Sequence, residues 1–155
     1  MDKTTKVFDS WAKAGRAEEM EEGHGVTVGK FLGSISFDKQ FTFLDIGCGN
    51  GRVDRKIAQL PKCKKAVGID KSKNMIKRAI SNSASKKEKY ARTDLESWNY
   101  AGKFDVIFSM ESLYYSVPME PALNKFSRCS KLAVYFTVGL IFTVTIISPR
   151  DGQKL

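Results

Sequence analysis

Short runs of adjacent apolar residues recur along the first two thirds of the chain. They occupy residues 41–46, 66–70 and 104–110, and they are rich in aromatic and β-branched side chains. Runs of this length and composition are typical of strands that are buried on both faces of a parallel sheet. The pattern therefore predicts a buried, mostly parallel sheet.

Apolar residues at helical spacing follow the first two of these runs. In the first stretch they are Val53, Ile57 and Leu60, whose spacings of four and three place them on one helical face. The charged residues of this helix are expected to stay in solvent: Arg52, Asp54, Arg55 and Lys56. Ser72 is suited to cap the second helix. The apolar stripe predicted for the second helix comprises Met75, Ile76, Ala79 and Ile80.

The turn after the first strand contains three glycines in the spacing GxGxG. Asp45 belongs to the strand, and Gly47, Gly49 and Gly51 form the turn. Glycine lets the backbone adopt unusual dihedral angles and lets a ligand approach closely. The spacing differs from the GxGxxG of a dinucleotide site. The second strand ends in Asp70, whose carboxylate can accept hydrogen bonds from the hydroxyls of a ribose, so this βαβ unit predicts a nucleotide-type cofactor site.

With these motifs the chain resembles a class I S-adenosylmethionine-dependent methyltransferase of the small-molecule branch. The resemblance runs from about Phe41 to Arg128. It implies a three-layer, Rossmann-like α/β fold with a mostly parallel sheet, S-adenosylmethionine as cofactor and S-adenosylhomocysteine as product. It also implies one domain over 1–155, with an N-terminal helical lid at 1–40, a cofactor-binding core at 41–130 and an atypical apolar tail at 131–155.

The resemblance assigns cofactor contacts to separate stations of the core. The turn would hold the methionyl part, Asp70 would bind the ribose, and Asp94 would accept from the exocyclic amine of the adenine. The implied cofactor-binding residues are Arg16, Asp45, Gly47, Gly49, Asp70, Lys71, Met75, Asp94, Leu95 and Ser109. Structural roles stay open beside these: the glycines as tight turns, Asp70 as a helix cap, Asp94 as a strand end and Met75 as core.

The lid and the segment after the fourth strand supply the remaining candidates for chemistry. Arg16 would pair with the carboxylate of the cofactor, and His24 can move a proton or lie in a solvated loop. Glu111 and Tyr114 follow the strand at 104–110 and can act as a base or serve a structural role. Methyl transfer demands mainly positioning. If the acceptor atom carries a proton, a nearby base would help, and the catalytic candidates are His24, Glu111 and Tyr114.

The net charge of +9 is concentrated in one segment. Residues 62–89 contain ten basic and two acidic residues, whereas the rest of the chain is nearly balanced. A solvated lysine-rich face is the favoured interpretation, and contact with RNA is the alternative. The cysteines at 48, 63 and 129 have neither pair nor metal spacing. We therefore expect a reduced, cytoplasmic protein without a metal.

Residues 132–148 form a run of seventeen residues without a charge. Two strands meeting near Gly139 fit its β-branched composition, and a short membrane helix is the less favoured alternative. The family normally continues with further strands, so we expect the final strands to be missing or replaced and the chain to be shortened. An open apolar strand would favour self-association through the C-terminal edge.

The function expected from the resemblance is methyl transfer from S-adenosylmethionine to an oxygen or nitrogen of a small metabolite. Two alternatives remain open: an RNA-directed methyltransferase, and a regulatory or partner subunit that binds S-adenosylmethionine without turnover.

Overall fold

The structure is a computed structural model of the chain. It describes residues 38–99 and 102–110, the backbone of residues 130–138 and 142–147, and scattered positions before residue 38. Among the residues expected to act at the site, Arg16, His24, Glu111 and Tyr114 lie outside the described residues. The helix expected at 118–128 lies outside them as well.

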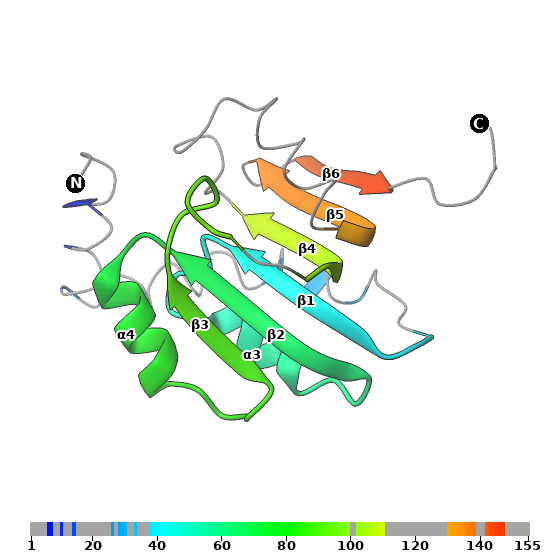
Figure 1. Cartoon of the computed structure of the whole chain (residues 1–155), viewed down its shortest axis with the longest axis horizontal. Coiled ribbons are helices and arrows are strands. Elements are labelled where there is room, and N and C mark those ends of the chain that lie inside the picture. The colour runs from blue at the N-terminus through cyan, green and yellow to red at the C-terminus, as the bar shows by residue number, and fades with distance from the viewer. Residues whose placement is uncertain are drawn as a thin grey trace.

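The described part of the chain forms one sheet with the strand order β3-β2-β1-β4-β5-β6 (Figure 1). The strands are β1 (Phe41–Ile46), β2 (Cys63–Asp70), β3 (Glu88–Arg92), β4 (Phe104–Met110), β5 (Ser130–Val138) and β6 (Phe142–Ile147). All pairs from β3 to β5 are parallel, and β6 pairs antiparallel with β5. The chain continues from β1 to β2 on one side of the sheet and from β4 to β5 on the other, so the strand order reverses between β1 and β4. In open α/β sheets, ligands bind at the carboxyl ends of the strands at this point.

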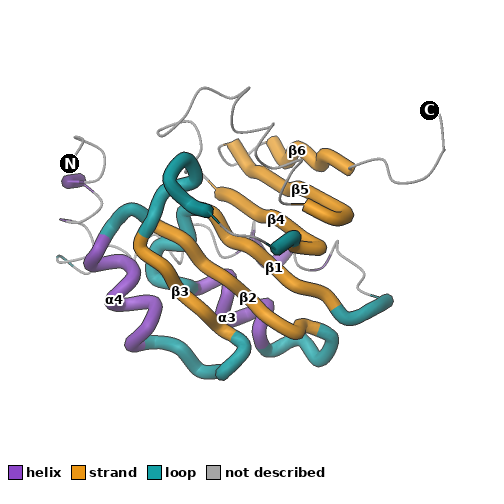
Figure 2. The backbone as a smooth tube through the Cα atoms, in the orientation of Figure 1, coloured by secondary structure: helices purple, strands orange, loops and turns teal. Residues whose placement is uncertain are grey.

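Two described helices flank this sheet. Helix α3 (Arg52–Ala58) lies behind β1 and β2, and α4 (Lys73–Ser81) runs beside β3 at the edge (Figure 2). The N-terminus of α4 is capped by Ser72, whose Oγ accepts a hydrogen bond of 3.1 Å from the backbone N–H of Met75. Helix α3 starts after the carboxyl end of β1, and α4 starts after the carboxyl end of β2. Both helices thus begin close to the predicted cofactor site.

The two faces of the sheet carry separate apolar clusters. On the α3 side, Phe43 stacks on Phe108 with ring centroids 6.1 Å apart, and Val53 and Ile57 of α3 pack into the same cluster. Val28, from the predicted lid, is also buried there. The opposite cluster contains the following residues: Leu44, Ile46, Val67, Ile69, Leu95, Trp98, Phe104 and Ile107. Alternate residues of β1 thus serve opposite faces, which fixes the strand's register.

The predicted fold class is confirmed. Strands β1 and β4 have the predicted bounds, Ser72 is the predicted cap, and residues 132–148 contribute to two strands rather than to one helix. None of the described helices is long and apolar enough to span a membrane. Whether the C-terminal edge self-associates stays a prediction.

Two expectations about the helices are wrong. Asp54 was expected in solvent, but it is completely buried because the helix turns it toward β2. Ile80 was expected in the apolar stripe of α4, but its side chain is 58% exposed. Since α4 lies at the sheet edge, Met75, Ile76 and Ala79 are sufficient to cover its contact with the sheet.

Candidate functional site

The glycine turn between β1 and α3 is held against the end of β2. The backbone N–H groups of Gly47 and Cys48 both donate to the carbonyl of Ile69, at 2.8 and 3.0 Å. Gly47, Gly49 and Gly51 have φ values of 76°, 52° and 77°. These values lie in the left-handed region, which glycine adopts without a steric penalty. The sequence therefore places glycine where this backbone path requires it.

Two of these glycines differ in the space that surrounds them. A Cβ on Gly51 would lie 2.5 Å from the hydroxyl oxygen of Tyr90, so this position has no room for a side chain. A Cβ on Gly49 would have no atom of the described residues within 4 Å. The turn is thus packed against β3 on one side and has open space at Gly49, where a ligand can approach the backbone.

Asp70, the last residue of β2, joins the glycine turn to the cap of α4. Its Oδ2 accepts from the N–H of Gly49 at 3.0 Å, and its Oδ1 accepts from the N–H of Ser72 at 2.7 Å. These two hydrogen bonds fix the Asp70 carboxylate against the backbone. Its contact with a ribose stays a prediction.

The predicted adenine station directly follows β3. The N–H of Thr93 donates to the carbonyl of Asp70 at 3.0 Å, which brings this segment beside the predicted ribose acid. Asp94 Oδ1 accepts from the N–H of Ser97 at 2.6 Å, and this hydrogen bond is the main cause of the lowered pKa of Asp94. Leu95 is buried with Trp98 against the sheet. The structure thus brings Asp70, Asp94 and Leu95 to one edge of the sheet.

The remaining described candidates have clear structural partners. The hydroxyl of Ser109 is buried and donates to the carbonyl of Ile46 at 2.8 Å, so it joins β4 to β1. Met75 is buried in the first turn of α4. The carbonyl of Lys71 accepts from Arg92 Nε at 3.2 Å. Cofactor contacts for these residues stay predictions, together with those of Asp94 and Leu95.

Asp45 does not stand alone beside the turn, because Asp54 shares its surroundings. Burial is the main cause of the raised pKa of both carboxyls. A hydrogen bond between the two side chains lowers the pKa of Asp45 and raises that of Asp54. The sequence analysis missed Asp54. A signal was present: Asp54, Ile57 and Ala58 have helical spacing, which puts the acid on the buried face.

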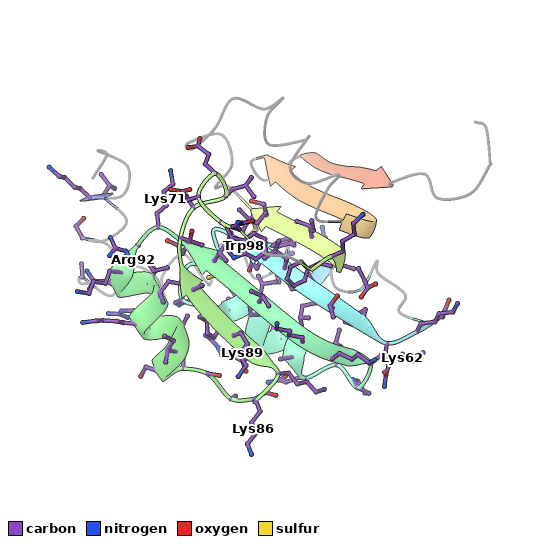
Figure 3. All side chains as sticks on the ribbon, viewed as in Figure 1. Lys62, Lys71, Lys86, Lys89, Arg92 and Trp98 are labelled. Atoms are coloured by element: carbon purple, nitrogen blue, oxygen red, sulfur yellow. The ribbon has the colours of Figure 1, made fainter. Side chains whose placement is uncertain are left out.

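The basic residues of 62–92 do not gather around this site. Lys71 and Arg92 lie near the carboxyl ends of β2 and β3, whereas Lys86 and Lys62 lie toward the opposite ends of the strands (Figure 3). Of the two acids between 62 and 89, Asp70 belongs to the candidate site. The other, Glu88, is buried and accepts from the Tyr90 hydroxyl at 2.7 Å. The labelled cations are therefore spread from one end of the strands to the other (Figure 3).

Comparisons with known proteins agree with this geometry. A family model described as a methyltransferase domain matches residues 37–145. Protein 235L of Invertebrate iridescent virus 6, which carries the name of a methyltransferase, is 31% identical over 137 residues. This match covers 81% of the chain and 49% of the viral protein, so the chain spans about half the length of the curated relative it matches.

Solved structures show the same arrangement of elements. A chain from the complex between the Haloferax volcanii Trm112 methyltransferase activator and its methyltransferase partner matches with a TM-score of 0.77 and 25% identity, covering 83% of this chain and 58% of that one. The N-methyltransferase NodS from Bradyrhizobium japonicum, in complex with S-adenosylhomocysteine, matches with a TM-score of 0.56 and 28% identity, covering 63% and 52%. Magnesium protoporphyrin IX methyltransferase from Synechocystis, with S-adenosylmethionine bound, shares the fold at 19% identity and a TM-score of 0.65, covering 88% and 76%.

The strand order, the glycine turn and Asp70 define a Rossmann-like nucleotide-cofactor fold. The chain belongs to the methyltransferase domain family, and its fold is that of the class I enzymes that use S-adenosylmethionine. Among the described residues, no group of His, Cys, Asp and Glu has an arrangement suited to a metal ion.

Proposed function

We propose that the chain uses S-adenosylmethionine to methylate an oxygen or nitrogen of a small molecule. The observation that carries the proposal is the position of Asp70. Its two carboxylate oxygens are fixed by Gly49 and Ser72, which holds an acceptor beside the glycine turn, as recognition of ribose hydroxyls requires. The open space at Gly49 leaves room for a ligand beside this carboxylate.

The other described residues fit the remaining parts of the cofactor. Asp45 is the penultimate residue of β1 and lies just before the turn. A carboxylate at this position would suit the ammonium of the cofactor. Asp94 and Leu95 follow Thr93, whose N–H donates to the carbonyl of Asp70, and this proximity supports them as the residues that would bind the adenine. The chain's own residues would therefore hold the methionyl, ribose and adenine parts in one row along the sheet edge.

The chain's contribution to the reaction is expected to be geometric. When bound, S-adenosylmethionine supplies a methyl group that its sulfonium already activates. Proximity and orientation can contribute about 7 to 11 kcal/mol to such a step. The predicted proton acceptors, His24, Glu111 and Tyr114, remain proposals. NodS, which is named as an N-methyltransferase, supports nitrogen as one acceptor atom.

An RNA acceptor has less support. Lys62 and Lys86 lie at the ends of the strands away from Lys71 and Arg92, so the labelled cations do not form one track that leads to the site (Figure 3). Backbone charge recognition of RNA would need such a track. The RNA-directed function and the non-catalytic subunit therefore stay alternatives that the experiment below must separate.

The test has two stages. Calorimetric titration of S-adenosylmethionine and S-adenosylhomocysteine should show saturable binding to the chain, lost in Asp70→Ala and kept in Glu96→Ala, which removes an exposed acid nearby. Radiolabelled methyl groups should then enter a small-molecule fraction of a cell extract. Binding without any transfer would support the non-catalytic subunit, label in RNA would support the RNA enzyme, and no binding would contradict the proposal.

A further inference from the structure

Asp54 is a buried carboxyl that the cofactor site alone does not explain. Its side chain is 0% exposed, and neither carboxyl oxygen receives a hydrogen bond from an N–H or O–H donor of the described residues. An ionised carboxylate in such surroundings is very costly, so a buried acid of this kind keeps its proton instead. Asp54 is therefore a neutral carboxyl with a proton available to donate.

The position of Asp54 is made possible by a glycine on the facing strand. A Cβ on Gly68 would lie 2.9 Å from Oδ2 of Asp54 and 2.7 Å from Sγ of Cys48. The carboxyl therefore occupies the space that a side chain at residue 68 would take. Gly68 pairs with Asp45 across β1 and β2, and neighbouring strands are about 4.8 Å apart. Asp54 thus lies directly beside Asp45, on the same face of the sheet.

Two carboxylates can only accept hydrogen bonds, so this pair can bond only if one member carries a proton. The charged groups that act on the pair are acids: Asp70 at the end of β2 acts on Asp45, and Glu88 on β3 acts on Asp54. Burial and, to a smaller extent, the charge of Asp54 raise the pKa of Cys48, Cys63 and Tyr90, and the cation Lys87 acts on Cys63. None of the described groups that act on Asp54 is a cation. The surroundings therefore keep the proton in the pair.

The two members are not equivalent. Asp54 is more deeply buried, with Glu88 adding to the charge that disfavours its ionisation. Asp45 lies at the end of β1 next to the turn. Burial, with a smaller contribution from the charge of Asp70, raises its pKa to about 8, and the hydrogen bond from Asp54 opposes this rise. The hydrogen bond thus makes Asp45 the easier of the two to ionise.

We propose that Asp54 is a positioning residue for Asp45: it holds the proton of the pair and donates a hydrogen bond, so that Asp45 becomes the carboxylate that receives the cofactor's ammonium. This inference rests on the proposed function, because it assumes that the ammonium binds beside the turn. Asp54 itself does not touch the cofactor and acts only through Asp45.

The test compares two variants that differ in the donor. Asp54→Asn keeps an N–H donor with nearly the same shape, whereas Asp54→Leu fills the space without a donor. The dissociation constant for S-adenosylmethionine is measured by calorimetry between pH 6.5 and 9.5 and divided by the wild-type value at each pH. The titration of the cofactor itself affects the wild type and the variants equally. The ratio therefore reports only on titrating groups of the protein.

For Asp54→Leu we expect a ratio of about ten or more at pH 6.5, because each unit by which the pKa of Asp45 rises costs a factor of ten. The ratio should fall toward one as Asp45 ionises at higher pH. For Asp54→Asn it should stay near one throughout. Glu88→Gln, which changes another buried acid on the same side, should give a ratio that does not vary with pH.

A ratio for Asp54→Leu that is constant across pH would overturn the inference, since a purely structural role weakens binding equally at every pH. A similar loss in Asp54→Asn would also overturn it. Absence of binding by the wild type would overturn the proposed function and this inference together, which distinguishes the two failures.

If Asp54→Leu fails to fold, Asp54→Asn still tests the proton directly. Carbon-13 spectra of labelled aspartate carboxyls should show one more protonated carboxyl at pH 7 in the wild type than in Asp54→Asn. An equal number in the two proteins would overturn the inference.

Discussion

Asp70 and Asp54 are aspartates on the two sides of one glycine turn, and their surroundings are opposite. Asp70 lies at the end of β2, where the N–H groups of Gly49 and Ser72 donate to its two oxygens. Asp54 lies under the turn on α3, where no described N–H or O–H group donates to it. The first environment maintains a carboxylate that accepts, and the second maintains a neutral carboxyl that donates. Backbone donors and burial thus give one side-chain type two roles.

The largest effect should be on the pH dependence of stability. Above about pH 4 an unfolded aspartate has lost its proton. In the folded protein without cofactor, burial raises the pKa of Asp45 to about 8 and that of Asp54 well above its ordinary value, so both keep their protons in this range. The folded state then binds more protons, so the free energy of unfolding falls as pH rises from 5 toward 8. Each proton contributes a slope of about 1.4 kcal/mol per pH unit.

Asp54→Asn should reduce this slope by the contribution of one proton. Urea unfolding of the wild type and the variant, measured at intervals between pH 5 and 8, checks the difference. Parallel curves for the two proteins would show that Asp54 does not hold a proton in the folded state.

Gly68→Ala should be the next largest change. The added Cβ would lie 2.9 Å from Oδ2 of Asp54 and 2.7 Å from Sγ of Cys48, and overpacking of this kind costs about 1 to 3 kcal/mol. Urea unfolding measures the loss. The same glycine substitution made in an Asp54→Ala background should cost less, because one of the two overlapping groups is gone. An equal cost in both backgrounds would place Asp54 away from Gly68.

Ser72→Ala should have a smaller effect on the Asp70 side of the comparison. It removes the Oγ that accepts from the Met75 N–H, and loss of such a cap costs about 1 kcal/mol. The N–H of Ser72 still donates to Asp70, so cofactor affinity should change little. Thermal unfolding and calorimetric titration of the same sample test the two halves of this prediction. A large loss of affinity with unchanged stability would give the hydroxyl a direct role at the site.

Asp94→Asn should have the smallest effect, and its sign should be opposite to that of Asp54. The N–H of Ser97 is the main cause of the lowered pKa of Asp94. Its contribution to stability is therefore present above about pH 4 and is lost as the pH falls through the lowered value. The variant should lose a small part of its stability at pH 7 and show a weaker decline in acid. Urea unfolding between pH 2 and 6 checks this, and a steeper acid decline in the variant would contradict it.

The sequence is informative where one type of residue has one physical reason to be present. The apolar runs at 41–46 and 104–110 have the length and composition of buried strands, and they coincide with β1 and β4. The glycine turn and Ser72 were also predictable, because positive φ values and helix caps select few residue types.

Asp54 is harder to assign from the sequence, because the space for its side chain depends on a residue farther along the chain. The absence of a side chain at Gly68 creates the space, and the pairing of β1 with β2 brings that space to α3. A charged residue on a helix is ordinarily solvated, and this general expectation outweighed the helical spacing of Asp54 with Ile57 and Ala58. Ile80 is the converse case: the edge position of α4 leaves part of its apolar stripe without a partner.

The basic segment shows the same limit. Basic residues that lie within one short segment of the sequence, at 62–92, are far apart in the structure. Lys62 and Lys71, for example, lie at opposite ends of β2 (Figure 3). The local charge count therefore overstates how closely these side chains gather.

The most direct test places Asp70→Asn and Asp54→Asn side by side in one titration of S-adenosylmethionine at pH 7.5. The account predicts a loss of affinity of about 100-fold or more for Asp70→Asn, since hydrogen bonds to a charged group contribute about 1.5 to 3 kcal/mol each. It predicts affinity within about threefold of the wild type for Asp54→Asn, because the amide still donates to Asp45. Equal losses in the two variants, or retained affinity in Asp70→Asn, would contradict the division of roles between the two carboxyls.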